Sequence, residues 1–322
     1  MNQNSLNTFY NKITQYFYQN FEDQPNINNF CLELKLSLNW SINNMNIYPI
    51  NSDGGGAILM TENNSFKEAY FGFIYASNEK IFSKIWSLIL DKANQLNVRH
   101  LKGPIQGTTF FPYRFVSKTD GSPFFKGEYF NTIKDHQFII RQKPDKIITY
   151  ESAHRSNFDN IIKISKPYYL KCKKEGYVFK RETHIDENLY IELYQIVNKI
   201  FCSNWGFQKI SLKDFFNYFS NNKDVSSKIM FHTIHKSKRL IGFARCIKEN
   251  EKTLIFKTVG LLPEYQKLGL GNAITCKVHV DAVKYEYKKI IYALIRSESR
   301  VNNMPDPDIT RFRTYSSYEF LL

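Results

Sequence analysis

One stretch of the sequence, residues 258–273, constrains the fold more than any other. It joins an apolar run at 254–261 to a turn opened by Pro263, and then to a segment that contains Gly269 and Gly271. Apolar residues recur after it at spacings close to three and four, which predicts a helix with one buried face: Ala273, Ile274, Val278, Ala282 and Tyr285. The stretch therefore predicts a strand, a glycine-bearing loop and a helix in immediate succession.

The two glycines make this loop a candidate anion site. Gly269 and Gly271 can adopt backbone angles closed to other residues, and their N–H groups can approach a ligand closely because no side chain intervenes. The first N–H groups of a helix have no partner within it, and the helix dipole adds partial positive charge there. We expect the loop to hold a phosphate or diphosphate group. The alternative is a glycine turn that joins strand and helix without a ligand.

The spacing of the glycines and their neighbours distinguishes the known kinds of phosphate-binding loop. A nucleotide-triphosphate loop would end in Gly-Lys-Ser or Gly-Lys-Thr, and a dinucleotide loop would have a third glycine where Ile274 stands. What remains is Gln266, two residues, Gly269, one residue and Gly271, preceded by Val-Gly-Leu-Leu-Pro-Glu-Tyr at 259–265. This pattern resembles the acyl-CoA-binding motif of the GNAT superfamily of N-acetyltransferases.

The resemblance implies an α/β protein of two GNAT-like domains, each a mixed, largely antiparallel sheet flanked by helices. Residues 1–150 would form a degenerate domain and residues 151–322 the acyl-CoA-binding domain. The order of three strands, a helix and a strand repeats in the two halves. In the first half no glycine pair follows the strand at 70–75, and Glu79 stands at the helix start, where a carboxylate repels an anion. We therefore expect a CoA site in the second half only.

The resemblance also implies an enzyme that transfers an acetyl or other acyl group from acyl-CoA to a primary amine of a small molecule, amino acid or peptide. Backbone groups of Val259 and Leu261 would bind the pantetheine arm, and the backbone near Val259 could donate to the thioester oxygen. Asn302 lies near the position of a pantetheine-contacting asparagine in the family. The residues expected to bind the acyl donor are Val259, Leu261, Gln266, Lys267, Leu268, Gly269, Leu270, Gly271, Asn272, Ala273 and Asn302.

The sequence does not single out a general base or a general acid, so the catalytic residues stay unassigned. The candidates are each more often packing or surface residues: His232, His235, Glu249, Glu251, Tyr315, Tyr318 and the carboxylate of Leu322. Lys267 and Lys277 are candidates for contacting the 3′-phosphate of CoA, against the alternative that both are solvated.

A second stretch, 103–115, resembles a Gly-Pro-x-Asn-x-Ser-Thr segment with a Tyr-Arg pair behind it, found in bacterial two-domain GNAT-like proteins. Here Gln106 and Thr108 replace the Asn and the Ser, and Tyr113 and Arg114 follow. The hydroxyl and amide groups of this loop either line a substrate pocket or satisfy the loop's own backbone.

Some elements are predicted by periodicity alone. Leu32, Leu34, Leu36 and Leu38 alternate with more polar residues, which predicts a strand over 31–40. Apolar residues over 6–21 have helical spacing and predict an amphipathic helix. The short, proline-containing segment 296–309 leaves the fourth helix of the family stunted or absent, and 312–322 predicts a last strand.

Composition narrows the range of partners. The net charge of +14 over 322 residues favours an anionic partner such as CoA, or else reflects a compositional bias of the source. The five cysteines lack metal-ligand spacing, so we expect no metal and a reducing compartment. No leader-like start and no apolar run of about twenty residues are present, which indicates a soluble cytoplasmic protein. No recognition-helix or zinc-finger signature supports a nucleic-acid partner.

Three functions remain open from the sequence. The first is a GNAT-type N-acyltransferase. The second is a transferase of the same double fold that uses a long acyl chain or an aminoacyl group. The third is an acyl-CoA-binding protein without turnover.

Overall fold

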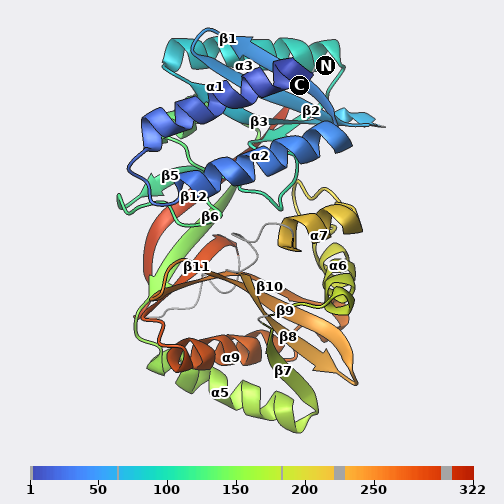
Figure 1. Cartoon of the computed structure of the whole chain (residues 1–322), viewed down its shortest axis with the longest axis vertical. Coiled ribbons are helices and arrows are strands. Elements are labelled where there is room, and N and C mark those ends of the chain that lie inside the picture. The colour runs from blue at the N-terminus through green and yellow to red at the C-terminus, as the bar shows by residue number, and fades with distance from the viewer. Residues whose placement is uncertain (1–2, 64, 183, 221–228, 299–306) are drawn as a thin grey trace. The chain divides into compact units, whose positions relative to one another are not determined.

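The computed structural model describes the chain except for residues 1–2, 64, 183, 221–228 and 299–306 (Figure 1). The chain divides into two compact units. The first contains residues 1–150 together with 313–322, and the second contains 151–312. The last ten residues thus belong with the N-terminal segment and not with the unit that precedes them in the chain.

The first unit pairs two N-terminal helices with a mixed sheet. Strands β1, β2 and β3 are antiparallel, β4 runs parallel to β3, and β12 pairs antiparallel with both β4 and β5. Its elements are α1 (Gln3–Phe21), α2 (Ile27–Asn44), β1 (Asn46–Ser52), β2 (Gly55–Glu62), β3 (Ser65–Ala76), α3 (Glu79–Gln95), β4 (His100–Gly103), β5 (Phe115–Thr119), α4 (Ile133–Arg141) and β12 (Thr310–Leu321). Strand β6 (Lys146–Arg155) leads from the first unit into the second.

The strand predicted over 31–40 is wrong, because these residues lie in α2. The buried positions of α2 recur at helical spacing and include Phe30, Cys31, Leu34 and Leu38. Leucine and lysine both favour helices, so the local sequence is compatible with either structure. Contacts with α1 and β1 then select the helix, and two of the alternating leucines, Leu32 and Leu36, remain only half-buried.

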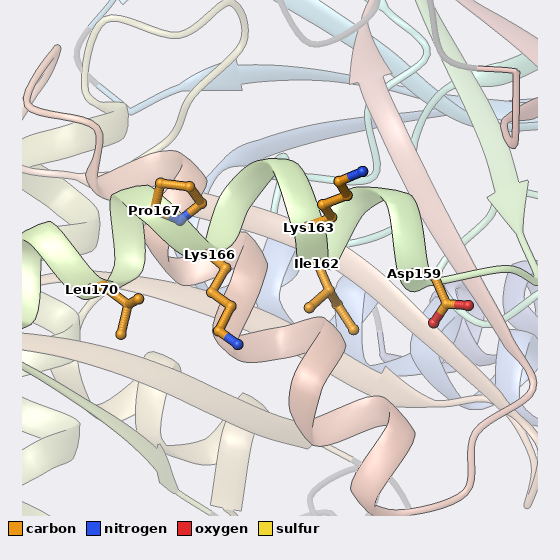
Figure 2. Close-up of a pocket in the computed structure, with 6 residues that line it drawn as sticks. All are labelled: Asp159, Ile162, Lys163, Lys166, Pro167 and Leu170. Carbon is orange, nitrogen blue, oxygen red and sulfur yellow. The ribbon is translucent and has the colours of Figure 1, made fainter.

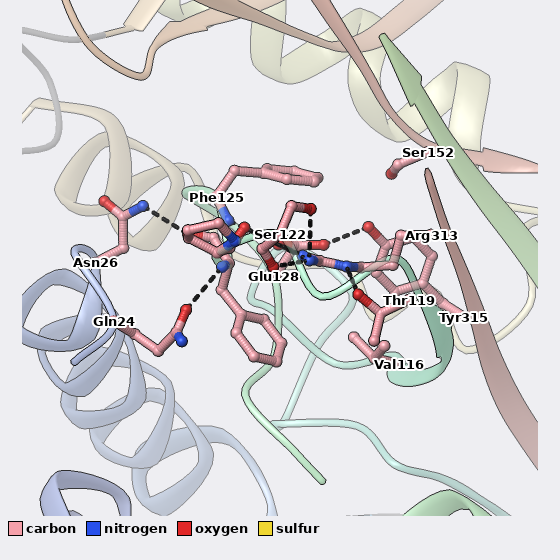
Figure 3. Close-up of polar contacts among 12 residues, drawn as sticks. Gln24, Asn26, Val116, Thr119, Ser122, Phe125, Glu128, Ser152, Arg313 and Tyr315 are labelled. Atoms are coloured by element: carbon pink, nitrogen blue, oxygen red, sulfur yellow. Dashed lines mark hydrogen bonds and ion pairs between the residues drawn. The ribbon is translucent and has the colours of Figure 1, made fainter. Parts of the chain in front are cut away.

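A buried ion pair holds the C-terminal strand in the first unit (Figure 3). Arg313 on β12 donates from Nη1 to Oε2 of Glu128 at 2.6 Å, and both side chains are almost fully buried. The backbone N–H of Phe125 donates to the same carboxylate oxygen at 2.7 Å, and the Tyr315 hydroxyl donates to the other. Arg313 also donates to the carbonyl of Ser122. The carboxylate and guanidinium are therefore both hydrogen-bonded, as a buried ion pair requires.

The second unit is a mostly antiparallel sheet with helices on both faces. Its strands lie in the order β11-β10-β9-β8-β7, and only β10 and β11 are parallel. Helices α5 and α9 pack together on one face, and α6 lies on the other (Figure 1). The elements are α5 (Asp159–Lys174), β7 (Tyr177–Glu182), α6 (Glu187–Phe201), α7 (Leu212–Ser220), β8 (Ile229–Lys236), β9 (Arg239–Lys248), β10 (Thr253–Leu261), the 3₁₀ turn η1 (Pro263–Tyr265), α9 (Leu270–Lys284) and β11 (Lys289–Arg296).

The two units repeat one element order. Three antiparallel strands are followed by a helix and then by a strand parallel to the third: β1 to β3, α3 and β4 in one unit, and β8 to β10, α9 and β11 in the other. In each unit the third strand also has a register shift against the second. The predicted fold class is confirmed: the protein is α/β, with mixed, mostly antiparallel sheets flanked by helices.

Candidate functional site

The loop that precedes α9 has backbone geometry that requires glycine. Gly269, the N-cap of α9, has φ of +83°, in the left-handed region. A Cβ added to Gly269 would lie 2.8 Å from a ring carbon of Tyr168 on α5. Both the dihedral angle and the contact exclude a side chain at this position. Lys267, two residues earlier, also has a positive φ of 64°.

The start of α9 is open. A Cβ added to Gly271 would meet no atom within 4 Å. No side chain caps the helix, and its first turn contains no acidic residue. The Ala273 N–H donates to the Gly269 carbonyl at 3.0 Å, so the amides of Leu270, Gly271 and Asn272 precede the first intrahelical bond. The helix therefore presents donors and partial positive charge at this end.

The corresponding helix start in the first unit, that of α3, is capped by a side chain of the chain itself. Asn78, the N-cap of α3, accepts a hydrogen bond from the Ile81 N–H at 3.0 Å. Glu79 then places a carboxylate in the first turn. The donors that are open at α9 are thus partly satisfied at α3, and the local charge has the wrong sign for an anion.

β10 and β11 part beside the α9 loop. They pair only over 253–256 and 289–292, and β10 has a register shift against β9 between Phe256 and Thr258. β11 then turns away, and the Leu294 N–H donates to the Ser152 hydroxyl at 3.0 Å. Beyond this point the ladder of β10 with β9 continues to Leu261. Every second backbone group of β10 there faces the side that β11 has left, and Val259 is 41% exposed.

The equivalent opening in the first unit is filled by the chain itself. After β4, the Ile105 N–H donates to the Phe71 carbonyl at 2.9 Å, and the side-chain carbonyl of Gln106 accepts from the Phe73 N–H. The approach is so close that a Cβ on Gly72 would lie 1.8 Å from the Ile105 oxygen. Of the two roles left open for this segment by the sequence, Gln106 has the structural one, since it satisfies backbone.

Several known structures share the fold of this chain. No family's sequence pattern and no curated protein matches the chain. A tandem GNAT protein from the clavulanic acid biosynthesis pathway has 9% identity and a TM-score of 0.54, over 90% of this chain and 87% of that one. A conserved Enterococcus faecalis protein described as a probable N-acyltransferase has 9% identity and a TM-score of 0.59, over 100% and 71%. A GCN5-related glucosamine N-acetyltransferase region of a fungal β-N-acetylglucosaminidase has 14% identity and a TM-score of 0.57, over 97% and 37%.

The chain has the tandem GNAT fold. At these identities the likeness concerns the fold, and any activity has to be argued from this chain's own residues. No helix among the described residues is long and apolar enough to cross a membrane.

The described residues expected to bind the acyl donor fall at the end of β10, in the loop that follows it and at the start of α9. Gln266 has a structural role there, because its Nε2 donates to the Leu261 carbonyl at 3.2 Å and ties the loop to the strand. Lys267 and Leu268 are exposed. Asn302 lies outside the described residues, as does most of the segment expected to have a stunted helix.

A buried chain of hydrogen bonds fixes α9 to β11. The Thr275 hydroxyl donates to the Gly271 carbonyl at 2.9 Å, and Nδ1 of His279 lies 2.7 Å from the Thr275 carbonyl. A carbonyl only accepts, so Nδ1 carries a proton, and Nε2 of His279 lies 2.6 Å from the Tyr292 hydroxyl. Tyr292 is the last β11 residue paired with β10. The chain thus links the glycine loop to the point where the strands part.

A second, largely buried cluster brings together His232 and Lys277, which the sequence analysis considered for separate roles. Nε2 of His232 lies 3.0 Å from Oδ2 of Asp281, and Nζ of Lys277 lies 2.7 Å from both Asp281 oxygens. Sγ of Cys246 lies 3.9 Å from Nδ1 of His232. Burial raises the pKa of the Cys246 thiol and lowers that of His232. The thiol is fully buried and neutral, so this Cys-His-Asp arrangement stabilises the fold and supplies no nucleophile. Lys277 is partly buried and is held by Asp281.

The other candidates for proton transfer receive no assignment. Tyr315 and Tyr318 are fully buried in the first unit, where the Tyr318 hydroxyl lies 2.5 Å from Nδ1 of His136. Glu251 is exposed and pairs with Lys248 at 2.5 Å. Sequence reasoning missed Tyr168, His279 and Tyr292, because their roles come from contacts between elements that no local motif records.

A shallow pocket of about 390 Å³ lies along the outer side of α5 (Figure 2). Its lining residues recur along one side of the helix: Asp159, Ile162, Lys163, Lys166, Pro167 and Leu170. Tyr168, which contacts Gly269, lies on the opposite side of α5 by helical spacing. The pocket is therefore separate from the α9 loop.

Proposed function

We propose that the second unit binds acyl-CoA and transfers its acyl group to a primary amine. One observation carries the proposal: an uncapped, glycine-bearing start of α9 and an unpaired edge of β10 occur together in this unit. The first unit has the same element order, yet its helix start is capped by Asn78 and its strand opening is filled by Ile105 and Gln106.

The residues present fit the chemistry of CoA. Its diphosphate would accept hydrogen bonds from the amides of Leu270, Gly271 and Asn272, where the helix dipole favours negative charge. Its pantetheine arm contains amides, which match the backbone groups that β10 presents near Val259 on the side that β11 has left. The exposed Lys267 adds positive charge beside the loop.

The bound donor would supply a thioester. The amine nitrogen forms a bond to the carbonyl carbon, the carbon–sulfur bond breaks, the amine loses a proton and the departing sulfur gains one. The contribution of this chain is chiefly to hold the two reactants together, which can supply a large share of the rate. Backbone N–H groups of β10 near Val259 would stabilise charge that develops on the thioester oxygen.

Replacement of Gly271 by tryptophan tests the donor site. The side chain would enter the open space before α9, so we expect Gly271→Trp to weaken CoA and acetyl-CoA binding at least about tenfold in isothermal titration, about 1.4 kcal/mol. Lys80→Trp is the matched control, because Lys80 is exposed at the same second position of α3. Unchanged affinity in Gly271→Trp, or equal loss in both variants, would contradict the proposed site.

Turnover is tested separately from binding. The wild-type protein should release free thiol from acetyl-CoA or from longer acyl-CoAs in the presence of a panel of primary amines. If the protein binds the donor but releases no thiol with any combination of acyl-CoA and amine, the transferase hypothesis is contradicted, and the protein is an acyl-CoA-binding protein without turnover.

A further inference from the structure

Arg114 in the first unit is held by two tyrosine rings. Its guanidinium carbon lies 4.0 Å from the ring centre of Tyr113 and 4.0 Å from that of Tyr150. Both tyrosines are buried, whereas Arg114 is half-buried and so reaches solvent. Ring faces attract the cation, but they do not accept hydrogen bonds in the plane of its N–H groups. The Tyr113 hydroxyl accepts a hydrogen bond from the guanidinium, but the Nε–H donor needs another partner.

This chain does not supply that partner at Nε. Within the described residues, the Nε–H of Arg114 is buried and has no hydrogen-bond acceptor, and no carboxylate forms an ion pair with the side chain. Burial raises the pKa of Tyr113 despite the nearby guanidinium, so the Tyr113 hydroxyl stays neutral and does not cancel the charge. A buried donor left unpaired costs about 1–3 kcal/mol, which a ligand that accepts from it would recover.

Ser317 has a second unpaired buried group, and the register of the strands places this residue opposite Arg114. On β12, residues 318–321 pair with β4 and residues 313–316 pair with β5, so Ser317 is the single residue between the two ladders. Extension of the β5 ladder by one residue places Ser317 opposite Arg114, and opposite residues project to the same face of a sheet. Its hydroxyl is fully buried and has no partner in the described part of the chain.

Arg313, on the same face of the sheet, has the kind of carboxylate partner that Arg114 lacks among the described residues. Arg313 projects to the same face of β12 as Ser317, by the alternation of side chains along a strand. Arg313 has a carboxylate partner within the chain, Glu128, at 2.6 Å. Among the described residues, a carboxylate thus pairs with Arg313 on this face, and none pairs with Arg114.

We propose that Arg114 and Ser317 form a binding site in the first unit for an oxyanion, the carboxylate or phosphate group of a small molecule. The guanidinium edge can donate in parallel to two oxygens of such a group, and the serine hydroxyl can donate to it as well. The tyrosine rings fix the guanidinium, so little side-chain entropy is lost on binding. This site does not depend on acyl transfer, and its test needs no acyl donor.

The test is an NMR titration of protein labelled with ¹⁵N at arginine Nε. Sodium acetate and sodium phosphate are added in separate arms, and sodium chloride at equal ionic strength is the control. We expect the Arg114 resonance, identified by its absence in Arg114→Lys, to shift saturably with acetate, phosphate or both, and not with chloride. Arg141 is the internal reference, because it is exposed and already pairs with Glu79 at 2.7 Å.

Ser317→Ala tests the second group of the site. Loss of one hydrogen bond should raise the dissociation constant of the responsive anion about three- to tenfold in the same titration. A wild-type Arg114 resonance that does not respond, or that responds equally to chloride, would overturn the proposal. An identical titration curve in Ser317→Ala would overturn it as stated, and if that variant does not fold the wild-type titration decides alone.

Discussion

His232 shows how one side chain can set the acid stability of the second unit. Burial lowers its pKa, although its bond to Asp281 acts in the other direction. The charged groups around it are Asp281 and Lys277 on α9 and Arg181 on β7, with the neutral thiol of Cys246 on β9. Because its folded-state pKa is depressed, the unfolded chain binds the proton more readily as pH falls below about 6.5. His232 therefore destabilises the folded state progressively below that pH.

We expect His232→Gln to reduce this pH dependence, because glutamine can keep a hydrogen bond to Asp281 but does not titrate. In wild type, each such histidine contributes at most about 1.4 kcal/mol of unfolding free energy per pH unit. His136 and His235 also have pKa values lowered by burial, so part of the pH dependence should remain in the variant. The slope of the unfolding free energy against pH is measured by urea unfolding between pH 5 and 7. The exposed His184 provides the control, and a slope that changes as much in His184→Gln as in His232→Gln would contradict the assignment.

The sequence indicates the residues whose role is local and misses those whose role is not. The requirement for glycine at 269 follows from the order of strand, turn and helix, and the structure shows it as a left-handed N-cap. Tyr168, which packs on that glycine, belongs to another helix and has no motif of its own. The stacking of Arg114 on Tyr150 likewise depends on a contact between separate segments, the loop before β5 and strand β6.

At the scale of elements, periodicity was sufficient where one face of an element is buried and the other is exposed. It predicted α3, α6 and the hairpin of β8 and β9, within a few residues at each end. It failed for α2, where Leu32 to Leu38 alternate as in a strand but pack as a helix. The deciding interactions there are with α1 and β1, and a local pattern carries no information about them.

The ion pair of Glu128 and Arg313 is the main polar tie between β12 and the loop that precedes α4. Glu128→Gln would keep the shape of the side chain but leave the buried guanidinium without its counter-charge. We expect it to lower the free energy of unfolding by about 3–5 kcal/mol, measured by urea denaturation.

The matched control for this prediction is the exposed ion pair of Glu79 and Arg141, whose nitrogen and oxygen lie 2.7 Å apart. Glu79→Gln should cost less than about 1 kcal/mol. Similar losses in the two variants would mean that burial does not determine the strength of the Glu128 pair.

At the scale of the whole molecule, the protein contains two copies of one element order with opposite properties. In the second unit the helix start is uncapped and the strand edge is free. In the first unit Asn78, Ile105 and Gln106 occupy the corresponding positions. The repeat could be predicted only in part from the order of apolar and polar segments, because the strand predicted over 31–40 lies in α2 and β1 was not predicted. The closure of the first copy could be predicted only in part, from the missing glycine pair and Glu79, because the bond from Phe73 to Gln106 joins distant segments.

A crystal structure of the protein with CoA bound is the decisive measurement for the donor site at α9. We expect the diphosphate oxygens within hydrogen-bonding distance of the amides of Leu270, Gly271 and Asn272, and the pantetheine arm along β10 beyond Phe256. A diphosphate bound elsewhere, for example at the lysines of α5, with the α9 loop empty, would contradict this expectation.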